Sequence, residues 1–140
     1  MVIESAAYLW IEAGDMQGGS RNQIEFTDDI VSFFDEKSRS DGQAFLAYDT
    51  KIKEYCALTN RGQDYDQWVN KWRLSLITKA KGGVDYPGRV VCFEKRKLGQ
   101  SYVYVISVAD IGSADHATWK SKSKYIGSTG GANGREYGYF

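Results

Sequence analysis

Apolar and polar residues alternate in short runs along this chain, a pattern typical of strands that bury one face. In the run from Trp68 to Ile77, the alternation places Trp72, Leu74 and Leu76 on one side. The run from Ser101 to Val108 is the one we expect at the centre of the fold. These runs predict strands over Ala6–Glu12, Asn22–Phe26, Gln43–Asp49, Ile52–Leu58, Trp68–Ile77, Arg89–Glu94 and Ser101–Val108.

Helical signals are few and short. Thr27 can cap a helix over Asp28–Asp35, which has two aspartates in its first turn and an apolar stripe ending in Phe33 and Phe34. Ala109–Trp119 is expected to hold one helical turn. Turns are predicted at Ser38–Gly42, Thr50–Lys51, Lys81–Gly88 and the basic Lys95–Gly99. Short strands separated by turns, with one or two small helices, indicate a barrel or another closed β architecture.

The length of 140 residues fits one domain with a real core, and 42% hydrophobic residues argue against disorder. We expect the domain over residues 1–119. Residues 120–140 form a Gly/Ser/Lys-rich tail, in which the glycines from Gly127 predict a linker or turn and Arg135–Phe140 a short strand.

Several functional classes are disfavoured by what the chain contains. No apolar run approaches the roughly 18 residues of a membrane span and no leader is visible, so a soluble, cytoplasmic protein without membrane contact is expected. Cys56 and Cys92 lie inside apolar runs and are expected to be reduced. His116 is the only histidine, which excludes zinc sites built on several histidines. No cofactor and no metal site is predicted.

Charge is unevenly distributed although the formal net charge is zero. Residues 1–50 hold three basic and ten acidic side chains, a net charge of −7, and residues 51–140 hold fifteen basic and eight acidic ones, a net charge of +7. The folded protein can therefore present one basic face, or the charges can scatter over the surface. With a neutral total, affinity for DNA would depend on specific contacts more than on bulk charge.

A polar, glycine-rich loop separates the first two predicted strands. It carries Gly14, Gly18 and Gly19 among hydrogen-bonding side chains. Glycine lets a backbone approach another surface closely, and Gln, Asn and Arg supply the donors and acceptors that read base edges. A loop that only turns the chain needs about two to five residues. A second polar insert follows at Asn60–Gln67. Plain solvated loops are the alternative.

With these inserts and this strand order, the chain resembles the B3-like DNA-binding pseudobarrel of plant transcription factors and of bacterial restriction endonucleases. Residues 8–26 and the helix ending at Phe33-Phe34 are similar to the opening of the effector domain of type IIE restriction enzymes and of the recognition domain fused to phospholipase-D type nucleases. Gly88–Arg96 and Ser101–Ile106 are similar to the late strand pair of the family. The resemblance spans roughly residues 6–110 and implies a mainly β, seven-stranded open pseudobarrel with one or two short helices.

The resemblance further implies two loops that grip the major groove, the N-arm and the C-arm. The N-arm residues are Asp15, Gln17, Gly18, Gly19, Ser20, Arg21, Asn22 and Gln23. The C-arm residues are Asn60, Arg61, Gln63, Asp64, Tyr65, Gln67, Asn70, Lys71 and Arg73. Asp64 and Asp66 depart from the more basic C-arm usual in the family, because a carboxylate accepts from cytosine but repels phosphate.

The chemistry of these side chains agrees with such roles. Arg21 or Arg61 can reach guanine, and Asn22 or Gln23 can bind adenine, each pair contributing about 1–3 kcal/mol of discrimination. Phosphates are expected at Lys71, Arg73, Lys79, Lys81, Lys95, Arg96 and Lys97.

Three functions follow as hypotheses. The first is a sequence-specific double-stranded DNA-binding domain, non-catalytic by itself, that serves a restriction endonuclease whose cleaving domain lies outside this segment. The second is a small Mg-dependent nuclease using Asp41, Asp49 and Lys51, since a carboxylate followed by Asp-x-Lys can hold Mg²⁺ and orient water. The third is a protein-interaction β-barrel.

Overall fold

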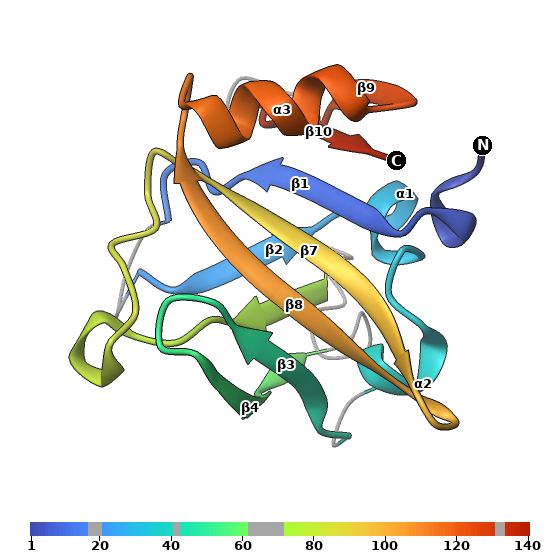
Figure 1. Cartoon of the computed structure of the whole chain (residues 1–140), viewed down its shortest axis with the longest axis vertical. Coiled ribbons are helices and arrows are strands. Elements are labelled where there is room, and N and C mark those ends of the chain that lie inside the picture. Colours follow the sequence, from blue (N-terminus) through green and yellow to red (C-terminus); the bar gives the residue numbers. More distant parts are fainter. Residues whose placement is uncertain (17–20, 41–42, 62–71, 131–133) are drawn as a thin grey trace.

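The computed structural model describes residues 1–16, 21–40, 43–61, 72–130 and 134–140 (Figure 1). Its strands in these ranges are β1 (Tyr8–Glu12), β2 (Gln23–Phe26), β3 (Phe45–Asp49), β4 (Glu54–Leu58), β5 (Asn60–Arg61), β6 (Trp72–Ser75), β7 (Arg89–Leu98), β8 (Ser101–Asp110), β9 (Tyr125–Ser128) and β10 (Glu136–Tyr139). The helices are α1 (Asp28–Val31), α2 (Glu36–Arg39) and α3 (Ala114–Lys122), with 3-10 turns η1 (Ile3–Ser5) and η3 (Lys79–Lys81). The mainly β class is confirmed.

Seven strands form one large mixed sheet in the order β4-β3-β8-β7-β1-β10-β9. The pair β3 and β8 is parallel, and the other pairs are antiparallel. In the described part of the chain, β4 and β9 are edges of this sheet, so the expectation of a closed barrel is wrong. Figure 1 shows the long β7–β8 hairpin running diagonally through the sheet. The run 101–108, expected at the centre, lies inside the sheet as part of β8, but the middle position belongs to its neighbour β7.

The strands β2, β6 and β5 form a separate small sheet, in that order. Its inner face packs on the large sheet through aromatic rings, because period-two alternation turns every second side chain inward. Phe34 lies at the centre of this core, with ring centroids 5.0 Å from Phe26 and Trp72, 5.2 Å from Phe93 and 5.1 Å from Tyr104. The predicted shared face of Trp72, Leu74 and Leu76 is buried, as expected.

Three local predictions are wrong. The helix predicted over Asp28–Asp35 ends at Val31, and a second helix, α2, begins at Glu36 where Asp35 accepts the Ser38 amide as an N-cap. The turn after Asp49 spans four residues, with Lys53 at φ 57°. Lys95–Leu98 is strand and not turn, because these residues pair along β8 up to Ser101.

The C-terminal residues belong to the large sheet. The expected strand over Arg135–Phe140 is present as β10 and pairs with β1, while Gly127 and Ser128, expected in a linker or turn, lie in β9. The division expected between residues 119 and 120 falls inside α3, which covers nine residues and not one turn. Trp119 of this helix packs on a small cluster of Trp10, Val90 and Cys92. Both cysteines are free.

Arg135 ties the two sheets together. Its Nη2 donates to the Glu25 carbonyl on β2 at 2.7 Å, and its Nη1 donates to the Glu12 carbonyl on β1 at 3.4 Å. A Cβ added to Gly14 would lie 2.8 Å from Arg135 Cδ, so only glycine fits here without a shift. The segment that leaves β1 is thereby held against the C-terminal strand. Among the described helices, none is long and apolar enough to cross a bilayer.

Candidate nucleic-acid interface

The outer face of the small sheet is polar throughout. Because inner and outer side chains alternate, the outward positions are Gln23 and Glu25 on β2, Arg73 and Ser75 on β6, and Arg61 on β5. Each of these side chains is exposed or half-buried, whereas Ile24, Phe26, Leu74 and Trp72 between them are buried. The register places Gln23 opposite Ser75, and Glu25 opposite Arg73, which in turn lies opposite Arg61.

The charges on this face are organised around Arg73. Its Nε lies 3.1 Å from Glu25 Oε1, with the two side chains 20% and 36% exposed. This ion pair fixes the orientation of the guanidinium at the middle of the face. Arg61 is exposed on the neighbouring edge strand. The small sheet therefore presents two arginines, one carboxylate, one amide and one hydroxyl on adjacent strands.

The N-arm residues that the structure describes divide into two kinds. The Asn22 side chain stabilises the fold, because its Nδ2 donates to the Leu76 carbonyl at 2.5 Å. The backbone carbonyl of Asn22 accepts the Leu76 amide at 2.9 Å. Arg21 and Gln23 are exposed, and Arg21 has φ 54° with a contact of 3.4 Å from Nε to the Met16 carbonyl. Asp15 is also exposed. Gln17, Gly18, Gly19 and Ser20 lie outside the described residues.

The C-arm residues show a similar division. Asn60 is buried and its Nδ2 donates to the carbonyls of Ser38 and Gln43, so this side chain faces inward. Arg61 and Arg73 lie on the outer face described above. Gln63, Asp64, Tyr65, Gln67, Asn70 and Lys71 lie outside the described residues.

The two arms begin at opposite ends of β6. Asn22 adjoins Leu76 just beyond one end, and Arg61 pairs with Arg73 near the other end. Leu76 lies three residue steps along the chain from Arg73, which corresponds to roughly 10 Å. The small sheet thus lies between the roots of the two arms, a relationship that the sequence did not reveal.

The basic cluster at residues 95–97 does not form one surface. Lys95 Nζ donates to the Phe33 carbonyl at 2.7 Å and to the Glu4 carbonyl at 3.0 Å, and it lies 4.5 Å from the Phe33 ring centroid. Burial lowers the pKa of Lys95. Arg96 points to the other side of β7 and pairs with Glu94 at 2.9 Å. Lys97 is exposed, over the Tyr102 ring.

The remaining predicted cations lie on η3. Lys79 and Lys81 are both exposed on this 3-10 turn, which follows β6 after Thr78. The turn ends at Gly82, with φ 97°, a backbone conformation that favours glycine. These lysines are placed on the side of β6 at which the N-arm begins.

The alternative metal-nuclease residues are placed as follows. Asp49 is buried, and its Oδ1 accepts the amides of Lys51 and Ile52 at 2.9 and 3.2 Å, so it closes the β3–β4 turn. Lys51 is exposed, and Asp41 lies outside the described residues. In the ranges that are described, no three His, Cys, Asp or Glu side chains are grouped to hold a metal ion.

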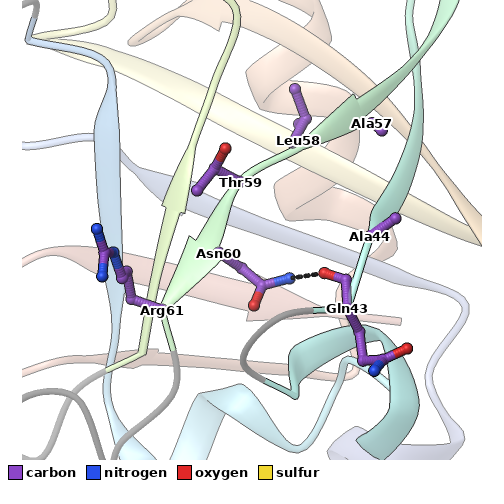
Figure 2. Close-up of a pocket in the computed structure, with 7 residues that line it drawn as sticks. All are labelled: Gln43, Ala44, Ala57, Leu58, Thr59, Asn60 and Arg61. Carbon is purple, nitrogen blue, oxygen red and sulfur yellow. Dashed lines mark hydrogen bonds between the residues drawn. The ribbon is translucent and has the colours of Figure 1, made fainter.

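A pocket of about 610 Å³ opens beside the root of the C-arm. Figure 2 shows its lining, which comes from the two residues before β3, the end of β4, Thr59 and β5: Gln43, Ala44, Ala57, Leu58, Thr59, Asn60 and Arg61. Sequence reasoning identified Asn60 and Arg61 but not the others. Glu25 and Ser75 were also missed, although their alternation with buried neighbours is a signal that identifies them as outward-facing.

No protein-family model and no curated protein matches this chain.

Proposed function

We propose that this chain is a sequence-specific double-stranded DNA-binding domain whose groove-facing surface is the outer face of the small sheet. The observation that carries the proposal is the register of that face, which sets Arg61 beside Arg73 and leaves Gln23 exposed on the same side. Arginine and glutamine are side chains that bind guanine and adenine edges in the major groove.

The dimensions of the small sheet are compatible with this role. Three strands separated by about 4.8 Å span roughly 10 Å, and the major groove is about 12 Å wide. Sheet and ribbon proteins read DNA by placing strands in a groove. In this arrangement Arg61 reads a base, Gln23 is a second reader, and Arg73, oriented by Glu25, contacts a phosphate or a base beside it.

The finer assignment is that the two sheets form a B3-like pseudobarrel, with N-arm and C-arm flanking the groove-facing sheet. The support is the open seven-stranded sheet, the small second sheet, and the connection of β1 to β2 and of β5 to β6 by the two polar segments. Within such a family the chain is the non-catalytic recognition domain of a restriction endonuclease, and the nuclease domain is a partner outside this segment.

A salt titration of binding tests the proposal. For a short specific duplex selected from randomised DNA, we expect a plot of log Kd against log salt concentration to have a slope of several units. We also expect this duplex to bind about 10³-fold or more tightly than random duplex. Equal affinity for all duplexes, or no dependence on salt, would contradict sequence-specific recognition.

A plasmid incubation with Mg²⁺ distinguishes recognition from catalysis. A recognition domain leaves the plasmid intact. Cleavage that disappears in Asp49→Ala, in a variant whose circular dichroism shows the fold retained, would overturn the non-catalytic assignment and favour the metal-nuclease hypothesis.

A further inference from the structure

Two turns that lie far apart in the sequence pack against each other. The first is the turn of residues 50–53 between β3 and β4, and the second is η3 with the glycine that ends it, Gly82. A Cβ added to Gly82 would lie 2.9 Å from Ile52 Cγ2, so the Ile52 side chain already lies against the Gly82 backbone. Figure 1 shows both turns on the left of the view. The two turns therefore form one continuous surface.

Exposed lysines, two from each turn, make this surface positive. Together they form the lysine surface: Lys51, Lys53, Lys79 and Lys81. Within the described ranges, none of these side chains takes part in an ion pair. Two acids flank the first turn. Asp49 is buried, and its Oδ1 accepts the backbone amides of the turn, while Glu54 begins β4.

The chemistry of the lysine surface suits a partner with repeated phosphates. The formal net charge of the whole chain is zero, so this surface is a local concentration of positive charge. A patch of one sign attracts partners of the opposite sign and speeds their association. Lysine binds phosphate as a point charge on a flexible stem and needs no fixed geometry. Several such cations can follow the phosphates of a nucleic-acid backbone without exact alignment.

The backbone at Lys53 gives a second indication. Its φ of 57° lies in the left-handed region, where glycine fits without strain. The Lys53 amide closes the turn by donating to the Asp49 carbonyl at 2.8 Å, a contact that glycine would make equally well. Residues held in this region concentrate at functional sites. The presence of lysine here is therefore better explained by its charge than by the turn.

We propose that the lysine surface binds the phosphate backbone of duplex DNA beside the bases that the small sheet recognises. The inference rests on the proposed DNA-binding function and adds a second contact to it. Lys79 follows Ser75, the last residue of β6, by four residue steps, which span at most about 14 Å. This is less than half of a helical turn of about 34 Å, so one duplex can contact both surfaces. Phosphates were expected at Lys79 and Lys81 from the sequence, and the contact between the turns adds Lys51 and Lys53.

The test compares the selected duplex, cut to its recognised bases, with the same duplex extended by one helical turn, about ten base pairs, on each side. We expect the intact chain to bind the extended duplex at least about tenfold more tightly and with a steeper slope of log Kd against log salt concentration. Three double variants carry equal losses of charge: Lys51→Gln/Lys53→Gln, Lys79→Gln/Lys81→Gln and, as the control beside α3, Lys122→Gln/Lys124→Gln. Each turn variant should lose much of the gain and lower the slope by about two, whereas the control should keep both.

Lys53→Gly separates charge from folding. Glycine removes the charge and suits the local φ, so urea unfolding should show no loss of stability while the extended duplex binds more weakly. The proposal is overturned if either turn variant behaves like the control, or if the turn variants lose as much affinity for the short duplex as for the extended one.

Failure of the lysine surface and failure of sequence-specific recognition are distinguishable. A random duplex of the extended length needs no recognised bases, so its binding reports on the lysine surface alone. If no sequence is preferred but both turn variants bind random duplex more weakly than the control does, the lysine surface is supported and the specific function fails. If the turn variants and the control bind random duplex equally, the lysine surface is overturned, whichever sequence the small sheet prefers.

Discussion

Arg61 on β5 lies directly opposite Arg73 on β6, so two guanidinium-bearing side chains share the outer face of the small sheet. Like charges opposite one another destabilise a strand pair. Glu25 on the third strand pairs with Arg73 and offsets part of that cost. Two cations held on one outward face favour contact with an anionic partner.

Replacing Arg61 with Ala should weaken binding to the preferred duplex by about 1–3 kcal/mol and relax the preference at one base position. Selection from randomised duplexes with each protein measures both effects. Lys122→Ala, an exposed change on α3, is the control and should alter neither. If Arg61→Ala weakens every sequence alike, Arg61 contacts phosphate and does not read a base.

Lys95 and Lys97, two residues apart on β7, should behave differently. Lys95→Ala removes the donor to the Phe33 and Glu4 carbonyls, so we expect a loss of about 1–2 kcal/mol in the free energy of unfolding. Lys97→Ala, at an exposed position, should change stability by less than about 0.5 kcal/mol. Urea denaturation measures both free energies of unfolding.

In DNA binding, Lys97→Ala should weaken all duplexes equally and reduce the slope of log Kd against log salt concentration by about one. A stable Lys95→Ala protein would contradict the structural role of Lys95.

Arg135→Met should lower the free energy of unfolding by about 2–3 kcal/mol, because the carbonyls of Glu12 and Glu25 lose their charged donor. Arg89→Met is the matched control. Arg89 pairs with Asp110 at 2.8 Å, but the side chains are 40% and 71% exposed, and exposed pairs contribute about 0–1 kcal/mol. Hydrogen exchange should become faster in β2 of Arg135→Met only. Equal losses in the two variants would show that Arg135 does not join the sheets.

Acid should destabilise the protein through His116. Burial, together with the nearby Lys120 charge, lowers the pKa of His116, although Glu136 and Glu12 act in the opposite sense. Nδ1 accepts the Gly112 amide at 3.0 Å, so the folded state favours the neutral ring. The unfolded chain then binds a proton at a higher pH than the folded chain. Stability is expected to be full above the ordinary histidine pKa and to fall as the pH decreases below it.

Urea unfolding between about pH 5 and 8, compared with His116→Gln, measures this contribution. His116 is the only histidine, so the difference between the two curves isolates it. The destabilisation of the variant should be largest at neutral pH and shrink as the pH decreases. A difference that does not vary with pH would contradict the expectation.

Strands with one buried face were predictable, because the alternation of apolar and polar residues is visible within a single short segment of sequence. Trp72 and Leu74 show it, and so do Ile24 and Phe26. The division of the strands into two sheets was not predictable, because β2 pairs with β6, which lies about fifty residues later in the chain. The charged run Lys95-Arg96-Lys97, followed by Gly99, was interpreted as a turn, but these residues continue the strand pair as far as Leu98.

The candidate interface was predictable in part. Arg61, Arg73 and Gln23 were identified as residue types that bind DNA, and the structure places them on one face. Asn22 and Asn60 carry the same chemistry but bond to backbone carbonyls. An amide beside a strand can satisfy the backbone or read a base, and only the three-dimensional neighbours distinguish the two uses.

The pairing of β1 has a consequence for how the protein is made. Leu9 pairs with Phe93 on one side and with Tyr139 on the other, so β1 leaves the ribosome well before either of its neighbours. Until then its apolar residues need protection from aggregation. Pairings so distant along the chain also slow folding in general. A nascent chain stalled before Arg135 should therefore lack the contacts that Arg135 makes with Glu12 and Glu25, and its two sheets should be held together less firmly.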